Sequence, residues 1–173
     1  MKPLGVVLAV WGVGGVLALI VRALLVLTPI AVDAVRSYEL TQAQWWILIV
    51  WILINGYAEG YRGFHLRFSP RVVDRGLYGG LHPTALRSVL APAFCMGLFD
   101  AGRRTLVSSW ILLGAITALV LTVRLVPQPW RGIIDAGVVA GLALGSLSIV
   151  VLFVRALATG RAPSLHDVPR AER

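Results

Sequence analysis

The chain has little charge and few groups suited to covalent chemistry. Charged residues make up 14% of its 173 positions, and it contains one cysteine, Cys95, and one lysine, Lys2. Soluble domains usually carry about 25% charged residues. A single cysteine excludes a disulfide within one chain, and the apolar neighbours of Cys95 predict a packed thiol rather than a nucleophile. These absences argue against a soluble enzyme and against a disulfide-stapled secreted module.

Apolar residues are abundant instead, at 58% of the chain, with a mean hydropathy of +0.82. Crossing a bilayer takes about 20 apolar residues, and four stretches meet that requirement: 4–32, 44–61, 105–126 and 130–157. The first is longer than the apolar region of a signal peptide, about 7–15 residues, so we expect it to be retained as a span. The sequence therefore predicts an all-α membrane protein, a four-transmembrane-helix bundle.

We expect a single membrane domain over residues 1–158. A mobile cytoplasmic tail is expected over 159–173, where proline, glycine and alternating charges replace the apolar pattern.

The distribution of charge predicts the orientation. Between the first two spans, Asp33 and Glu39 outnumber Arg36, whereas the segment from Glu59 to Arg104 holds seven arginines and three acidic residues. Cytoplasmic segments carry an excess of Arg and Lys. We therefore expect the middle segment and both termini on the cytoplasmic side of a bacterial-type inner membrane.

The middle segment, 62–104, is expected to form two short interfacial or re-entrant helices on the cytoplasmic side. Phe68-Ser69-Pro70 predicts a bend followed by a short amphipathic helix that Gly79-Gly80 would end. Ala85–Phe99 is apolar but too short to span, which is typical of a helix at or partly within the membrane interface.

A first polar cluster lies at the end of the second expected span. Asn55, Glu59 and Arg62 are spaced by four and three residues, which places them on one face of an α-helix. Polar groups near the end of an apolar helix should face the bundle or a wet cavity. The cluster is either an ion or headgroup site, or a pair in which Glu59 and Arg62 satisfy each other.

A second cluster of similar spacing, Asp100, Arg103 and Arg104, begins the third expected span. At a matching depth the two clusters could cross-link, as Glu59 with Arg103 or Asp100 with Arg62, or the arginines could hold a phosphate. With a neighbouring histidine they form one candidate polar or lipid-headgroup site: Asn55, Glu59, Arg62, His65, Asp100, Arg103 and Arg104.

No cofactor or metal is predicted, because no dense cluster of His, Cys, Asp and Glu is present. Haem held by His65 and His82 is the one alternative, although neither lies inside an expected span.

Small residues recur at four-residue intervals in two of the expected spans, at Gly137, Gly141 and Gly145 and at Gly114 and Ala118. Such faces let another helix approach closely in lipid. The approaching helix could belong to the same chain, to a second copy or to another protein.

The leading hypothesis is a non-enzymatic structural or accessory subunit of a membrane assembly or homo-oligomer, with lipids and a membrane protein as partners. The alternative is a small transporter, channel or lipid-binding protein that uses the acid–arginine cluster, and the third is a lipid-modifying enzyme. Nucleic acid is not expected as a partner, because the positive-inside rule already accounts for the arginines.

Overall fold

The computed structural model describes residues 2–161, which form helices and their connections with no strand in that part of the chain. The expected tail beyond Arg161 lies outside the described residues. In chain order the elements are α1 (Pro3–Arg36), α2 (Gln42–Asn55), η1 (Gly56–Phe68), α3 (Ser69–Leu81), α4 (Ala85–Val89), α5 (Ala91–Cys95), α6 (Arg103–Val123) and α7 (Trp130–Thr159).

Within residues 2–161, three helices are long and apolar enough to cross a membrane: α1, α6 and α7. The prediction of four such helices is therefore wrong, and the error lies in the stretch 44–61. The α-helix there, α2, has only 14 residues and ends at Asn55. Its continuation, η1, is a π-helix that carries Glu59, Arg62 and His65, so the stretch is not one apolar helix.

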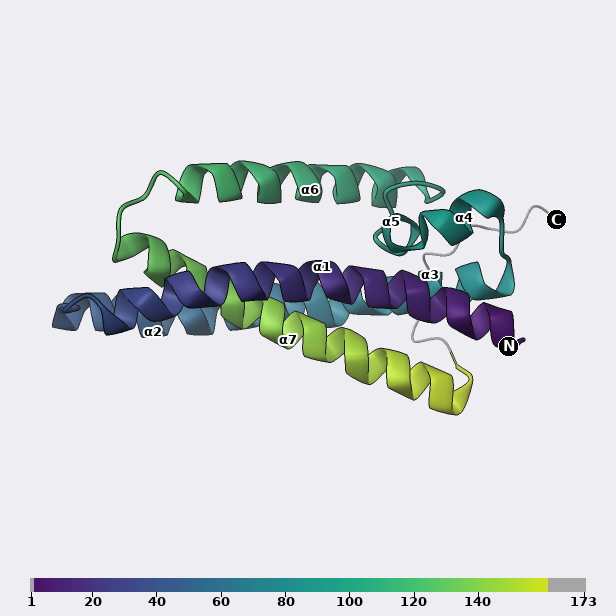
Figure 1. Cartoon of the computed structure of the whole chain (residues 1–173), viewed down its shortest axis with the longest axis horizontal. Coiled ribbons are helices and arrows are strands. Elements are labelled where there is room, and N and C mark those ends of the chain that lie inside the picture. Colours follow the sequence, from purple (N-terminus) through teal and green to yellow (C-terminus); the bar gives the residue numbers. More distant parts are fainter. Residues whose placement is uncertain (1, 162–173) are drawn as a thin grey trace.

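The helices α2, η1 and α3 follow one another without a break from Gln42 to Leu81, and they run the length of the bundle (Figure 1). A capping box begins this long helix: the Thr41 hydroxyl accepts from the Gln44 N–H at 3.3 Å, and the Gln44 side chain accepts from the Thr41 N–H at 2.9 Å. Both donors would otherwise lack partners.

The expected bend at Ser69-Pro70 does not form. The N–H of Ser69 donates to the carbonyl of Phe64, five residues back. Pro70 has no N–H to donate, and it lies where the π-helical hydrogen bonding of η1 changes to the α-helical hydrogen bonding of α3. Its missing donor therefore interrupts no regular α-helical ladder. Gly79 and Gly80 likewise remain helical, with Gly79 against the Phe94 ring.

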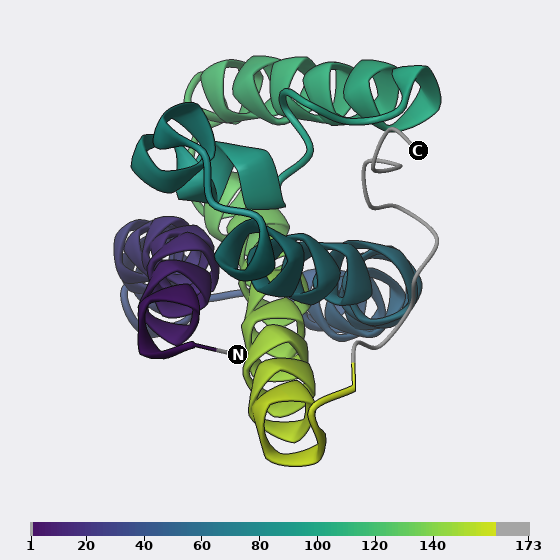
Figure 2. The same ribbon diagram turned by 90° about the vertical axis from the view of Figure 1, so that its right-hand side faces the viewer.

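α3 is not the expected surface helix, because its apolar stripe lies in the core. Val72 packs with Val13 and Val16 of α1 and with Ile149 of α7. Further along, Val73 and Leu77 pack with Ala9 of α1 and Ala156 of α7. The end-on view shows α3 beside α1 and across α7 (Figure 2). Burying the stripe against two neighbours stabilises α3 more than exposure at the headgroup layer would.

The expected helix over Ala85–Phe99 is divided into two. Thr84 caps α4 by accepting from the Arg87 N–H at 3.3 Å, and the chain turns at Leu90. Pro92 then occupies the first turn of α5, where its missing N–H costs nothing. α5 lies directly on α1, because a Cβ on Gly12 would come within 2.8 Å of the Cys95 sulfur.

α6 stands apart from the other long helices (Figures 1 and 2). Of its side chains, those of Ser109 and Val123 are buried, and every residue from Gly114 to Thr122 is exposed. The start of α6 is held by two hydrogen bonds to the preceding turn: Ser109 donates to the Met96 carbonyl at 2.9 Å, and Trp110 donates to the Leu98 carbonyl at 3.1 Å. α6 is thus anchored at its first turns and open along its length.

The contact between α1 and α5 can be tested with two adjacent glycines. A Cβ on Gly15 would lie 2.3 Å from the Cγ atom of Pro92, whereas nothing lies within 4 Å of a Cβ on Gly14. Gly15→Ala should force α5 away from α1 and destabilise the protein by about 1–3 kcal/mol. Gly14→Ala should leave the unfolding midpoint in detergent nearly unchanged.

Alkylation of Cys95 gives a second readout. Burial raises the pKa of the Cys95 thiol to about 12, and nearby Arg75 only partly opposes this. The thiol should therefore resist maleimide at pH 8 in the wild type and in Gly14→Ala, and react faster in Gly15→Ala. Equal reactivity and equal midpoints in the two variants would contradict the packing of α5 on α1.

Candidate functional site

A fully buried arginine, Arg75 of α3, organises the end of the molecule where α3, α5 and the start of α6 meet. Its Nε donates to the Phe94 carbonyl at 2.6 Å, and its Nη2 donates to the carbonyls of Phe99 and Asp100 at 2.9 and 3.0 Å. Its guanidinium carbon also lies 4.1 Å from the centre of the Phe94 ring. A buried cation is tolerated only when its donors are satisfied. The Phe94 carbonyl also accepts from the Gly97 N–H at 3.0 Å, whereas Phe99 and Asp100 lie in the connection between α5 and α6.

Sequence reasoning missed this residue, because it counted every arginine of the segment as a determinant of orientation. The available signal was the position of Arg75, three residues after Val72 and two before Leu77. That spacing places it beside the apolar stripe of α3, and its neighbour Asp74 is also buried, at 2% exposure.

Asp100 belongs to the same end of the molecule and is paired with Arg87 of α4, at 2.5 Å between Nε and Oδ2. Arg87 also donates to the His82 carbonyl at 3.3 Å and lies 5.5 Å from the centre of the Tyr78 ring. The expected pairing of Asp100 with Arg62 is not formed, because the division at Leu90 brings Arg87 to the turn that holds Asp100.

Asn55 and Glu59 lie against α7, but Arg62 does not join them. Asn55 is 5% exposed and, like Glu59, it borders a glycine of α7. Arg62 is exposed, and no ion pair joins it to Glu59 in the described part of the chain. The prediction of one shared face assumed the α-helical period, whereas η1 has the wider turn of a π-helix, which rotates Arg62 away.

His65 is hydrogen-bonded through Nδ1 to the hydroxyl of Ser148 on α7. Its ring stacks on Tyr61 with centroids 5.5 Å apart, and Tyr61 stacks on Tyr57 at 6.0 Å. His82 stacks on Tyr78 at 4.5 Å.

The two histidines considered for haem are not brought together. They lie at either end of a helical run whose rise is about 25 Å, so one iron could not be shared between them. Within residues 2–161, no three His, Cys, Asp or Glu side chains group as metal ligands would.

The glycines of α7 face the long helix of the same chain. Added Cβ atoms would meet Trp51 at Gly137 (2.5 Å), the Glu59 side chain at Gly141 (3.1 Å) and the Phe64 ring at Gly145 (2.4 Å). Trp51 also donates to the Ile134 carbonyl at 3.2 Å. The small face of α7 is therefore filled within the chain. In contrast, nothing lies within 4 Å of a Cβ on Gly114, and Ala118 is exposed.

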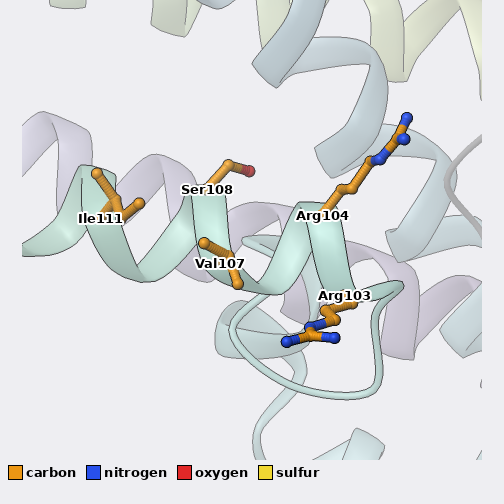
Figure 3. Close-up of a pocket in the computed structure, with 5 residues that line it drawn as sticks. All are labelled: Arg103, Arg104, Val107, Ser108 and Ile111. Carbon is orange, nitrogen blue, oxygen red and sulfur yellow. The ribbon is translucent and has the colours of Figure 1, made fainter.

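Arg103 and Arg104 are exposed on the first turn of α6, away from Glu59. They line a shallow open cavity of about 540 Å³ together with Val107, Ser108 and Ile111 (Figure 3). A second, apolar cavity of about 360 Å³ lies between α1, α5 and α6, and its walls include Trp11, Leu19, Pro92, Met96 and Leu113.

The candidate site is therefore not one site. Its residues fall into a group against α7 (Asn55, Glu59 and His65), an ion pair between α4 and the connection that precedes α6 (Arg87 with Asp100) and exposed arginines (Arg62, Arg103 and Arg104). No protein-family model, curated protein or solved structure matches the chain. Function is accordingly inferred from these residues and their geometry.

Replacing Arg75 tests whether it joins α3 to the end of α5. In Arg75→Lys the charge remains, but a single ammonium cannot reproduce the planar fork that reaches three carbonyls. The Phe94 carbonyl would keep the Gly97 N–H, but the Phe99 and Asp100 carbonyls would each lose the Arg75 donor. Each such loss costs about 1–3 kcal/mol, so the unfolding midpoint should fall by several degrees.

Arg67→Lys is the matched control, because Arg67 is exposed on η1. Its effect should stay within about 0.5 kcal/mol. If the two variants unfold at the same temperature in detergent, Arg75 does not hold these elements together.

Proposed function

We propose that the protein is a non-enzymatic subunit of a membrane assembly, in which two copies associate through α6. The observation that carries the proposal is the isolation of this helix, whose residues from Gly114 to Thr122 are all exposed. Helices of a bundle normally bury one stripe against their neighbours. α6 leaves that stripe uncovered, although its length and hydropathy suit a membrane span.

Small residues make the exposed face suitable for another helix. Within lipid, apolar surface alone does not drive helices together, and close approach over small side chains supplies the contact energy. On α7 and α1 the corresponding glycines already meet Phe64, Trp51 and Pro92 of the same chain. The face at Gly114 and Ala118 is the counterpart on α6 that the chain leaves open.

The position of this face suits a symmetric dimer. At about 100° per residue, Ala118 lies half a turn around α6 from Ser109, whose side chain faces the bundle. A second copy could therefore pack on Gly114 and Ala118 without displacing any contact within the chain. A twofold axis uses the same patch on both copies, so one small-residue face is sufficient.

The proposed topology has four crossings, with the long helix from Gln42 to Leu81 as the fourth. Support comes from its course along the bundle and from the ends of the described chain, which lie on the same side as α3, α4 and α5 (Figure 1). That side holds Arg75, Arg87, Arg103 and Arg104, so the positive-inside rule favours the cytoplasmic face of an inner membrane.

A conduit is less well supported than an assembly subunit. A transporter or channel through the polar cluster would need a cavity that reaches Asn55 and Glu59. The two cavities at α6 are lined by neither residue.

Disulfide cross-linking tests the dimer. Ala118→Cys places a thiol on the small face, and Ile116→Cys places one at the same depth on the opposite side, where the side chain is 50% exposed. In vesicles treated with a mild oxidant, Ala118→Cys should form covalent dimers and Ile116→Cys should not. The wild type is a further control, because its Cys95 is buried.

Dilution with excess lipid separates association from random collision. The Ala118→Cys dimer should persist as the lipid-to-protein ratio rises. If both variants cross-link equally, or if Ala118→Cys stays monomeric at every ratio, α6 is not the interface and the proposed function fails.

A further inference from the structure

The two arginines that begin α6 carry charges that the chain itself does not use. Asp100, the acidic residue nearest to them in sequence, is already paired with Arg87 at 2.5 Å. Among the described residues neither Arg103 nor Arg104 forms an ion pair, and both side chains are exposed. Two uncompensated guanidinium groups therefore stand at one end of an apolar helix.

The surface beside them combines a cationic end with an apolar wall. In Figure 3 the two arginines extend in different directions from the first turn and flank the face that carries Val107, Ser108 and Ile111. These five residues line the cavity of about 540 Å³. The hydroxyl hydrogen of Ser108 is committed to the Thr105 carbonyl at 2.9 Å, so the side-chain donors that remain for a ligand are the two guanidinium groups.

The start of the helix reinforces the positive potential. Gly102 precedes α6 without any side-chain cap, and the space around its Cα is open. The unpaired N–H groups of a first helical turn favour an anion, and arginine binds phosphate oxygens through two parallel hydrogen bonds.

We propose that this cavity binds one anionic phospholipid, with its headgroup at the positive end of α6 that Arg103 and Arg104 form and an acyl chain along Val107 and Ile111. A lipid fits better than a soluble phosphate compound, because the rest of the wall is apolar and continues into a helix of membrane-spanning length. The proposal does not rest on dimerisation: the cavity occupies the first turns of α6, and the dimer face at Gly114 and Ala118 lies beyond it.

Native mass spectrometry of detergent-solubilised protein offered equal amounts of phosphatidylglycerol and phosphatidylcholine tests the site. The wild type should retain one phosphatidylglycerol in preference to phosphatidylcholine, with about a fivefold contribution from each arginine. The Arg103→Gln/Arg104→Gln variant should lose that preference. The matched control, Arg62→Gln/Arg67→Gln, removes the same charge from exposed positions on η1 and should keep it.

A second variant tests the acyl-chain wall without changing the charge. Val107→Trp should fill the cavity and reduce retention of phosphatidylglycerol, and it serves as the decisive variant if the double glutamine variant fails to fold. Unfolding midpoints of all variants identify any loss caused by misfolding.

Three results would overturn the proposal: no lipid preference in the wild type, equal loss in the η1 control, or unchanged retention in Val107→Trp. Displacement of the lipid by inorganic phosphate alone would instead assign the arginines to a soluble anion. None of these results depends on whether Ala118→Cys cross-links, so failure of the lipid site and failure of the dimer are distinguishable.

Discussion

The burial of Arg75 is the constraint on which the end of the structure that holds α3, α4 and α5 depends. A guanidinium group with no exposure to solvent must find acceptors within the protein, and it finds them in the carbonyls of Phe94, Phe99 and Asp100. These carbonyls lie at the end of α5 and just before α6. By binding them, α3 fixes where α5 rests and where α6 begins, and the close contact of Pro92 with Gly15 then seats α5 on α1.

Two modes of helix packing follow from this anchoring. α1, α7 and the long helix from Gln42 to Leu81 approach closely where glycines meet larger side chains, as at Gly145 with Phe64 and Gly60 with Leu144. α6 is held at its first turns by Ser109 and Trp110, and its remaining length makes no comparable contact. Because three long elements pack so tightly and the fourth is left open, we place both proposed contacts on α6: the lipid at its first turns and the second copy beyond them, at Gly114 and Ala118.

Much of this architecture could be predicted from the sequence, and the failures have physical causes. Long apolar runs located α1, α6 and α7 to within a few residues, because crossing a bilayer sets a minimum length. The π-helix η1 was not predictable, since its register depends on contacts with α7 rather than on composition. That register is also why Arg62 points away from Asn55 and Glu59, against the expected common face.

In the candidate site, too, contacts between distant parts of the chain could not be predicted from the sequence. The spacing of small residues predicted packing faces on α7 and α6. The face of α7 is filled by the long helix of the same chain, whereas that of α6 is exposed, because the partner of such a face depends on how the chain folds back on itself. Arg75 and Arg87 escaped notice, because an arginine in a basic segment looks the same in sequence whether it is buried or exposed. Pairing of Asp100 with Arg87 needed the turn at Leu90, which no single residue signals.

The most direct test of this account is a nitroxide scan along α6, from residue 110 to 121, in bilayers at high dilution. Collision with dissolved oxygen reports lipid exposure at each position. If α6 is open along its length, accessibility should be high on all sides of the helix at these positions, with a decrease confined to the side of Gly114 and Ala118 as protein concentration rises. A regular minimum on the side of Leu113 and Ile116 at every concentration would show that α6 packs against its own bundle, and would contradict this account.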